Sequence, residues 1–294
     1  MASWIRFGVV WVLCVGLTVL LGAPADGAQW AGLPVLWWCF ALAFLVQWLA
    51  FLPAYWKQTE HFFDLTGSLT YLAVMIGSLG LSALERPPGL AQWLVSAAVT
   101  MWAVRLGTFL FRRVQADGGD GRFDDLKISV PKFLIVWTIQ GAWVSMTALA
   151  MLIVNTGPAR LERPWMLAVG ALMWVAGFAI EVVADRQKRV FRRDPAQSGR
   201  FIQSGLWSWS QHPNYFGEII LWTGIFIMSG SVVDGWGWRG AISPVFVAFL
   251  LMKVSGVPLL EARAEARWGD DPEYQRYRTT VPVLIPRPPR VAGR

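Results

Sequence analysis

Eight long apolar segments, separated by short polar or Pro/Gly-rich stretches, dominate this chain of 294 residues. A helix needs about 20 mostly apolar residues to cross the hydrocarbon core of a bilayer. Only 15% of the residues are charged, whereas a soluble domain carries about 25%, so a water-soluble fold is excluded. We predict an all-α polytopic membrane bundle with seven or eight transmembrane helices. The segments cover residues 4–22, 32–54, 65–84, 90–111, 132–154, 164–184, 215–232 and 241–260.

The first segment allows two interpretations. Residues 1–28 hold one arginine, an apolar stretch and small residues at 25–28. This pattern is typical of a cleavable signal peptide as well as of a membrane helix. A retained helix gives eight spans, and a cleaved one gives seven with the N-terminus outside.

The lysines and arginines are distributed unevenly between the connections. If all eight segments span, the connections after the second, fourth and sixth share a side with both termini, and that side holds 20 of the 26 basic residues. The other side holds four. Cytoplasmic loops carry such an excess, so we predict a multi-pass protein of a bacterial inner membrane with basic loops and C-terminus in the cytoplasm. This orientation explains the net charge of +7 without a nucleic-acid partner.

The sequence lacks the motifs of a disulfide framework, a zinc site and a Rossmann domain. Cys14 and Cys39 lie in apolar segments and have no disulfide or zinc-site spacing. No Gly-x-Gly-x-x-Gly follows a strand-like stretch, which excludes a Rossmann domain. We therefore expect no metal, and any nucleotide has to be held by the helices and their cytoplasmic loops.

Ionisable residues inside or bordering membrane segments are candidates for function, because leaving them unpaired is costly. The first cluster runs from Tyr55 to Asp64. If this stretch is helical, Glu60 and Asp64 lie one turn apart with His61 beside them. A carboxyl whose pKa is raised by burial can donate a proton to a substrate carbonyl. The alternative is an interfacial turn with solvated charges.

The second cluster is Arg105 and the Gly/Asp-rich loop 117–125. Arg105 lies six residues before the end of the fourth segment, from where its side chain can reach the interface. The loop does not have the ligand spacing of an EF-hand. We expect a turn ordered by pairing between arginine and aspartate.

The third cluster is a stripe of charge that continues out of the sixth segment. Glu181, Asp185, Arg189 and Arg192 recur at helical spacing. Arginines of this kind can bind the phosphates of a dinucleotide, and the carboxylates its ribose hydroxyls. A juxtamembrane patch for anionic lipid headgroups is the alternative, although carboxylates do not suit it.

The fourth cluster lies in residues 205–218 and is followed by a break in the eighth segment. Pro213 can open a helix at its first turn, which places His212 and Asn214 at the mouth of the seventh segment, with Glu218 one turn further on. An amide and a carboxylate together can hold a carboxamide such as nicotinamide; a helix cap by Asn214 is the alternative. Pro258 is expected to kink or break the last segment.

Together these motifs resemble those of bacterial members of the steroid 5-alpha-reductase family, the membrane 3-oxo-5-alpha-steroid 4-dehydrogenases. The resemblance begins near residue 36 and is strongest over 181–278. There, E-x-x-x-D-x-Q-K, G-L-W, H-P-N-Y-F-G-E, S-G-V-P-L-L-E and Y-x-x-Y follow in order. It implies one helical domain over 1–294, with substrate-side helices over 1–130, a cofactor-binding region over 131–280 and a flexible tail over 281–294.

The resemblance also implies a reaction. NADPH, held in a cytoplasm-facing cavity, reduces the C=C bond of a conjugated enone in a steroid-like lipid that enters from the bilayer. The hydride goes to C5 of a delta-4-3-ketosteroid, and a monomer is expected to act. By position, the implied cofactor contacts are Arg105, Arg122, Glu181, Asp185, Arg189, Arg192, Arg200, His212, Asn214, Tyr215, Glu218, Glu261 and Tyr277.

At the ketone, the family uses a Gln and a Glu from an early helix and a Tyr from a later one. Gln58 and Glu60 match the first two, with one residue between them instead of none, and Trp102 occupies the position aligned with the Tyr. Glu60, with Gln58, is expected to hydrogen-bond the ketone oxygen and stabilise the developing enolate. The implied catalytic residues are Gln58, Glu60, Tyr55 and Tyr71, and the implied substrate contacts are Trp56, Asp64 and Trp102.

Two other classes of protein remain open. Isoprenylcysteine carboxyl methyltransferases share a similar His-Pro-x-Tyr-x-Gly motif and bind S-adenosylmethionine. The many arginines favour a phosphorylated cofactor, since a sulfonium ligand does not require them. Another sterol reductase fits the same motifs, and a non-enzymatic lipid-binding or scaffold protein is the last alternative.

Overall fold

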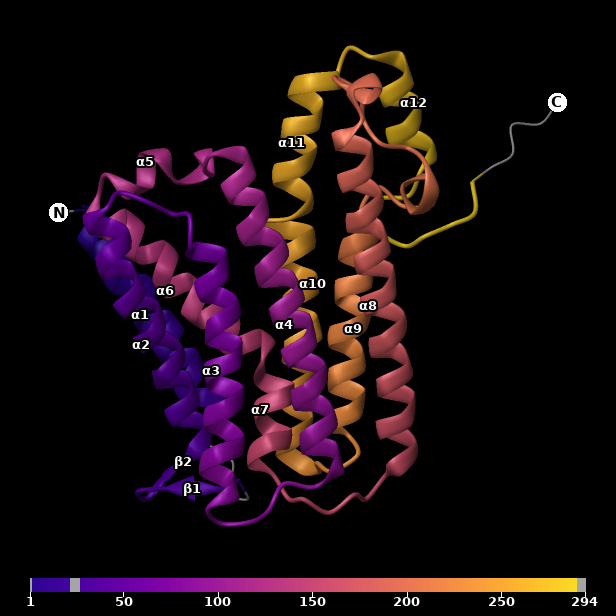
Figure 1. The fold of residues 1–294 in the computed structure, drawn as a ribbon. Helices are drawn as coiled ribbons and strands as arrows, with labels where there is room; N and C mark the ends of the chain where they lie inside the picture. Colours follow the sequence, from indigo (N-terminus) through magenta and orange to yellow (C-terminus); the bar gives the residue numbers. More distant parts are fainter. Residues whose placement is uncertain (1, 22–26, 290–294) are drawn as a thin grey trace. The chain divides into compact units, whose positions relative to one another are not determined.

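The computed structural model describes residues 2–21 and 27–289 and confirms an all-α polytopic bundle (Figure 1). Among these residues, six helices are long and apolar enough to cross a membrane. A pair bent by 55°, Val130–Thr147 and Leu149–Thr156, makes a seventh if it counts as one span. The seventh predicted segment forms α9 (Pro213–Ser229), which is 17 residues long. Residues 25 and 26 of the possible signal-peptide site lie outside the described residues.

The chain divides into two compact units, which we describe separately. The first unit comprises Met1–Ala168 and Ile225–Ser243, and the second Val169–Gly224 and Pro244–Arg294. Helices of the first unit are α1 (Ala2–Leu21), α2 (Val35–Trp56), α3 (Phe63–Ala83), α4 (Leu90–Asp117), α5 (Asp124–Lys127), α6 (Val130–Thr147) and α7 (Leu149–Thr156). Short 3-10 turns cover Gly121–Phe123 and Gly235–Ala241.

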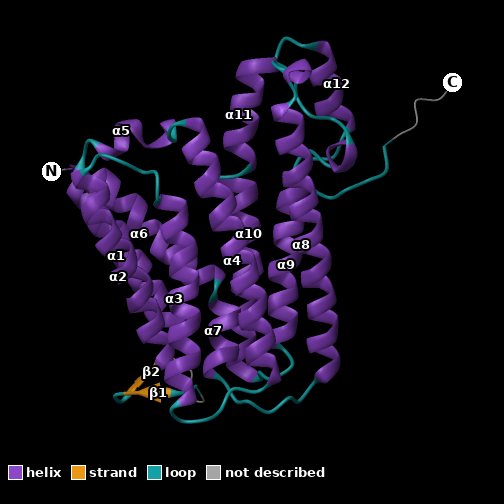
Figure 2. Ribbon diagram, viewed as in Figure 1, coloured by secondary structure: helices purple, strands orange, loops and turns teal. Residues whose placement is uncertain are grey.

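The two ends of the first unit carry different connections. A short hairpin of β1 (Gln29–Trp30) and β2 (Leu33–Pro34), drawn in orange in Figure 2, precedes α2. The Gln29 N–H donates to Glu85 and the Ala28 N–H to the Thr156 carbonyl, so the hairpin lies beside the connections that follow α3 and α7. The connections that follow α2 and α4 meet each other at Glu60 and Asp120. Successive helices therefore alternate in direction, as membrane spans do.

An aromatic cluster holds these last two connections onto the helices. Phe133 and Trp137 of α6 are completely buried. Phe123, from the 3-10 turn after α4, packs on Phe63 at the start of α3, with 4.9 Å between ring centroids, and on Phe133 at 6.3 Å. Burial of aromatic rings provides much of the packing energy of a core. The polar loops on either side are thereby fixed in place.

Helix α4 is longer than its apolar segment. It continues to Asp117 and ends where Gly118 takes a left-handed conformation, with φ of 77°. Arg105 therefore lies twelve residues before the end of the helix, and the expected six is wrong. A helix of 28 residues is about 42 Å long, whereas the hydrocarbon core of a bilayer is about 30 Å thick. The helix therefore continues beyond the apolar segment, through the mostly polar residues that follow it.

The second unit is built on a close pair of helices, the later part of α8 (Pro164–Arg193) and the first part of α9 (Pro213–Ser229). Pro213 is the first residue of α9, as predicted. The other elements are 3-10 turns at Pro195–Gln197 and Gly205–Ser208, then α10 (Ile242–Phe249), α11 (Val257–Trp268) and α12 (Pro272–Thr280).

The last predicted segment is interrupted just before Pro258. A π-helical turn covers Leu250–Val254, and Gly256 departs from helical geometry before α11 begins at Val257. Pro258 stands in the first turn of α11, where its missing N–H costs nothing. The predicted break is thus confirmed.

Candidate functional site

The stretch between α2 and α3 is a turn, so the helical arrangement considered for Glu60 and Asp64 is wrong. Helix α2 ends at Trp56, and Gln58 has a positive φ of 50°, which interrupts a helix. Helix α3 begins at Phe63, whose N–H donates to the Glu60 carbonyl. Asp64 therefore lies in the first turn of α3, while Glu60 belongs to the turn before it.

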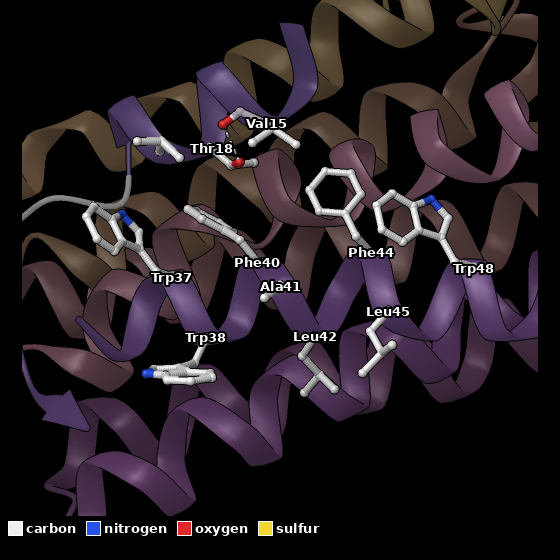
Figure 3. A pocket seen from close by; sticks show the side chains of 11 residues that line it. Val15, Thr18, Trp37, Trp38, Phe40, Ala41, Leu42, Phe44, Leu45 and Trp48 are labelled. Carbon is white, nitrogen blue, oxygen red and sulfur yellow. Dashed lines mark hydrogen bonds between the residues drawn. The ribbon is translucent and has the colours of Figure 1, made fainter. Parts of the chain in front are cut away.

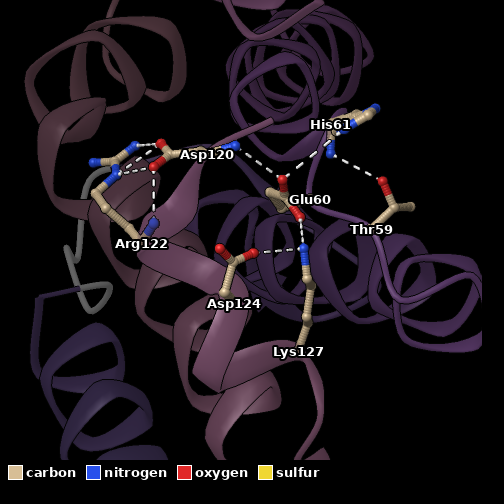
Figure 4. Close-up of polar contacts among 7 residues, drawn as sticks. All are labelled: Thr59, Glu60, His61, Asp120, Arg122, Asp124 and Lys127. Atoms are coloured by element: carbon tan, nitrogen blue, oxygen red, sulfur yellow. Dashed lines mark hydrogen bonds and ion pairs between the residues drawn. The ribbon is translucent and has the colours of Figure 1, made fainter. Parts of the chain in front are cut away.

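Glu60 is the centre of a buried polar cluster (Figure 4). Its side chain is only 3% exposed. One carboxylate oxygen accepts the backbone N–H of Asp120 at 2.9 Å, and the other lies 3.0 Å from Nζ of Lys127. The same ammonium group lies 2.9 Å from Asp124. The turn before α3, the loop after α4 and the short helix α5 thus meet at one carboxylate.

Glycines allow the loop after α4 to come this close. A Cβ atom at Gly119 would lie 3.0 Å from Oε1 of Glu60, and Gly119 has a positive φ of 147°. Arg122 then pairs with Asp120 through its Nε, 2.9 and 2.7 Å from the two carboxylate oxygens. The predicted turn ordered by an Arg–Asp pair is confirmed.

The cluster keeps Glu60 ionised. Burial opposes its ionisation, but hydrogen bonds from the Asp120 N–H and from Lys127 outweigh burial, so the pKa of the Glu60 carboxyl lies below its ordinary value. Hydrogen bonds to Asp124 and Glu60 raise the pKa of Lys127. The pair is therefore a carboxylate and an ammonium group at neutral pH.

The other candidate residues of the first unit lie around this cluster in separate groups. Gln58 is exposed, and its Nε2 donates to the Tyr55 carbonyl. Tyr55 stacks on Phe51, and Trp56 is 82% exposed. Asp64 lies 3.7 Å from Arg113.

Further along α3 and α4, Tyr71 and Trp102 are buried and meet edge to face, with 5.1 Å between ring centroids. The structure therefore brings these two candidates together. Arg105, on α4, lies 5.3 Å from the ring centroid of Phe109.

In the second unit, buried carboxyls and exposed arginines follow each other along α8. Glu181 is 2% exposed and Asp185 is 8% exposed, whereas Arg189 and Arg192 are exposed. A Cβ atom at Gly217 of α9 would lie 2.7 Å from the backbone N of Glu181. The buried part of the stripe therefore lies directly against α9.

The 3-10 turn at Gly205–Ser208 is attached to α8. The Leu206 N–H donates to Gln187, and Nε1 of Trp207 donates to the Ala184 carbonyl at 3.1 Å. Nζ of Lys188 lies 4.4 Å from the centroid of the Trp207 ring, a favourable cation–π contact. Gly205 has a positive φ of 63° and leaves no room for a side chain beside Gln187.

His212 is a buried, neutral base just before α9. Its ring stacks on Tyr215 at 5.3 Å, and its backbone N–H donates to Ser210. Burial, together with the nearby charge of Lys188, lowers the pKa of His212 to about 4. Among the described residues, Nδ1 of His212 has no hydrogen-bond partner.

The remaining candidates of this unit lie on or near the same helices. Asn214 and Glu218 are half-buried on the first turns of α9, and Glu261 is half-buried on α11. Tyr277 of α12 donates to the Trp207 carbonyl at 2.8 Å. Arg200 is exposed and lies 3.9 Å from Glu273.

The C-terminal segment, expected to be a flexible tail from 281, bonds back to the residues before α9. The Gln211 N–H donates to the Pro282 carbonyl, and Ser210 donates to Leu284 at 2.8 Å. The Arg287 N–H donates to the Trp209 carbonyl.

Lys127 is the important residue that sequence reasoning missed. Its spacing of three from Asp124 was a visible signal for a pair on one helical turn, but nothing local indicated Glu60, which is 67 residues away. Arg113 was missed for the same reason, since its partner, Asp64, lies far away in the sequence at the start of α3.

A family model described as "Protein of unknown function (DUF1295)" matches residues 50–281. The chain is 28% identical over 123 residues to "Steroid 5-alpha-reductase DET2" of Arabidopsis thaliana and 27% identical over 118 residues to "3-oxo-5-alpha-steroid 4-dehydrogenase 1" of Mus musculus. It is 31% identical over 81 residues to "Probable O-methyltransferase ustE" of Ustilaginoidea virens. These matches span 42%, 40% and 28% of both this chain and the respective relative. No solved structure matches the chain.

Proposed function

Because the chain belongs to the DUF1295 family and is similar to steroid 5-alpha-reductases, we propose that it is an NADPH-dependent reductase of a conjugated enone in a steroid-like lipid. The reaction adds a hydride to the β carbon of the enone, C5 in a delta-4-3-ketosteroid, and a proton to the α carbon. The activity is proposed for a monomer in the membrane, with the basic loops on the cytoplasmic side.

The observation that supports this proposal most strongly is the order of charges along α8. Its buried carboxyls, Glu181 and Asp185, precede the exposed arginines of the same stripe. Carboxylates accept hydrogen bonds from ribose hydroxyls, and arginines bind phosphates through bidentate hydrogen bonds. The residues present therefore fit a phosphorylated dinucleotide, with its phosphates toward the exposed end of α8. Arg105 and Arg122 are proposed as phosphate contacts on the resemblance to the reductase family alone.

The first turns of α9 are proposed to hold the nicotinamide end. Asn214 and Glu218 lie one helical turn apart, and an amide with a carboxylate can hold both ends of a carboxamide. His212 and Tyr215 stack on each other at the start of the same helix and offer a flat surface to a ring. Glu261 and Tyr277 complete the proposed set. NADPH, when bound, supplies the hydride.

At the ketone end, we assign the hydrogen-bond donor to the pair of Glu60 and Lys127. Since the pKa of Glu60 is lowered, its carboxyl carries no proton to donate at neutral pH. The Lys127 ammonium group has three N–H donors, two of which are directed to Glu60 and Asp124. The third can be donated to a ketone oxygen, where it stabilises the developing enolate, while Glu60 holds the ammonium group in position.

Three further residues, Gln58, Tyr55 and Tyr71, are proposed as additional or alternative hydrogen-bond donors to the ketone oxygen. Gln58 would have to leave its bond to the Tyr55 carbonyl to reach the same oxygen. Tyr55 and Tyr71 each carry a hydroxyl that can replace the ammonium group as donor. Trp56, Asp64 and Trp102 are proposed as substrate contacts.

The first experiment measures NADPH binding and its consumption with progesterone by the full chain in detergent. The Asp185→Asn variant is expected to lose binding, and Lys127→Met is expected to bind NADPH but to turn over about 100-fold more slowly. Asp125→Asn and Asp270→Asn, exposed carboxyls outside the proposed site, serve as controls. If wild type does not bind NADPH, the proposal is wrong. If Tyr55→Phe or Tyr71→Phe loses turnover while Lys127→Met retains it, the donor is that tyrosine.

A methyltransferase is the second candidate, because one relative is named a probable O-methyltransferase. The same preparation is therefore titrated with S-adenosylmethionine. Binding of that molecule without binding of NADPH would replace the reductase proposal with a methyl transfer.

A further inference from the structure

Three successive polar residues, Ser210, Gln211 and His212, are buried immediately before α9, with exposed fractions of 0%, 9% and 7%. Buried polar groups are normally hydrogen-bonded. The chain that follows α12 supplies the partners of the first two. We call residues 282–287 the C-terminal strap, which belongs to the same unit as the start of α9.

Gln211 attaches its loop to the end of α12 and to the beginning of the strap. Its backbone N–H donates to the Pro282 carbonyl at 2.9 Å. Its Nε2 donates to the carbonyls of Arg278 and Val281, at 3.0 and 2.6 Å. The last carbonyls of a helix have no partner within the helix, so Gln211 satisfies the end of α12 while it holds its own loop.

Ser210 connects the strap to His212. Its hydroxyl donates to the Leu284 carbonyl at 2.8 Å, with the Val283 carbonyl at 3.3 Å, and accepts the His212 N–H at 3.1 Å. A hydroxyl can donate and accept at the same time. The His212 carbonyl in turn accepts the Phe216 N–H in the first turn of α9. The backbone at the start of α9 is therefore tied to the strap through one side chain.

Arg287 holds the far end of the strap. Its N–H donates to the Trp209 carbonyl at 3.0 Å. Residues 286, 288 and 289 are prolines, so residue 287 has the only backbone N–H in this stretch. Prolines also favour extended backbone in the residue before them. The strap is thus bonded to the loop before α9 at both of its ends.

We propose that the C-terminal strap positions the start of α9 for the cofactor, and that Ser210 is the positioning residue through which it acts. The inference rests on the proposed function, in which His212, Asn214 and Tyr215 contact NADPH. A site that is ordered beforehand binds more tightly, because less freedom is lost on binding. If the loop is loosened, the apparent affinity falls with the fraction of molecules that remain competent to bind.

The first test compares Ser210→Ala with wild type, using the full chain in detergent. Hydrogen–deuterium exchange without ligand, read by mass spectrometry, should be about tenfold faster at the amides of residues 211 and 212 in the variant. Fluorescence titration should give a Kd for NADPH that is about fivefold higher. Ser208→Ala is the matched control, because the Ser208 hydroxyl donates to the Gly205 carbonyl within its own turn. It should behave as wild type in both measurements.

The second test changes the strap and leaves the loop intact. Arg287→Pro removes the N–H that is donated to Trp209, and a proline suits the extended backbone between two other prolines. Arg287→Ala removes the same charge and keeps the N–H. Faster exchange at residues 209–212 and weaker NADPH binding are expected for Arg287→Pro only. This pair also tests the strap should Ser210→Ala not fold.

A general loss of stability is separated by a variant of the other unit. Phe40 is buried and lines an apolar pocket of about 550 Å³ between α1 and α2 (Figure 3). Phe40→Leu enlarges this cavity and should lower the melting temperature. Exchange at residues 209–212 and the Kd for NADPH should stay at their wild-type values.

Unchanged exchange in folded Ser210→Ala and Arg287→Pro proteins would show that the strap does not hold the loop. Faster exchange with an unchanged Kd for NADPH would show that the strap serves stability only. Equal effects of Phe40→Leu and Ser210→Ala would lead to the same conclusion. Each of these results overturns the role of the strap and leaves the proposed function standing. A wild-type protein that does not bind NADPH refutes the proposed function itself, and with it any positioning for that cofactor.

Discussion

Gly177 and Gly217 meet back to back: a Cβ atom added to either would lie 2.6 Å from the carbonyl oxygen of the other. The same crossing continues at Gly224, whose Cβ would lie 2.6 Å from the carbonyl oxygen of Gly170. Small residues at this spacing let two helix backbones approach closely inside a membrane. Glu181 is one turn on from Gly177, so the close crossing also sets the distance between Glu181 and α9.

Gly217→Ala is expected to lower the free energy of unfolding by about 1–3 kcal/mol, because the methyl group has only backbone atoms to displace. The measurement is a thermal melt in detergent. Gly80→Ala in α3 is the control, because a Cβ there would meet nothing within 4 Å. An equal effect of the two substitutions would contradict the close crossing.

Acid is expected to weaken the cluster around Glu60. A carboxyl with a lowered pKa in the folded protein contributes stability that is present above its ordinary pKa of 4.5 and lost as the pH falls through the lowered value. The melting temperature of wild type should therefore decline below pH 4.5, and that of Glu60→Gln should decline less. Asp125→Asn, at an exposed position, should follow wild type. Parallel pH curves for wild type and Glu60→Gln would show that the carboxylate is not held as described.

Local patterns predicted the helices of this fold well, because a membrane span depends mainly on a long run of apolar residues. Pro213 at the start of α9 and the break before Pro258 follow from the missing N–H of proline. The pairing of Arg122 with Asp120 was also predictable, because only Gly121 separates them.

Interactions between distant segments could not be predicted in this way. Gln58 has a positive φ although it is not a glycine, so its residue type did not indicate a turn there. The burial of Glu60 depends on a loop 60 residues away. The sequence indicated that Glu60 was important, but its charge state depends on the Asp120 N–H and on Lys127. The proton donor was consequently the least predictable part of the candidate site.

His212 is expected to make the protein sensitive to mild acid. Its pKa is lowered to about 4 from an ordinary value of 6.5, so the unfolded chain binds a proton more readily, and stability falls as the pH drops from about 6.5 toward 4. The shift corresponds to a loss of about 2 kcal/mol between pH 7 and pH 5. His212→Phe should abolish this loss, whereas His61→Phe, at a more exposed histidine, should retain it. Thermal melts at the two pH values provide the measurement. A wild-type protein that is equally stable at both would contradict the buried, neutral state of His212.

The arginines beyond Asp185 on α8 are expected to determine affinity for a phosphorylated cofactor. Arg189 is exposed and lies one turn after Asp185, and an ionic hydrogen bond to a phosphate contributes about 1.5–3 kcal/mol. Arg189→Ala should therefore raise the Kd for NADPH at least tenfold. This difference should shrink in high salt, because exposed charges are screened. Arg186→Ala is the matched control, since position 186 lies about 100° around the helix from Asp185. Fluorescence titration with NADPH at two salt concentrations measures both. Equal losses in the two variants would mean that the stripe acts only through its total charge, as a patch for anionic lipids does.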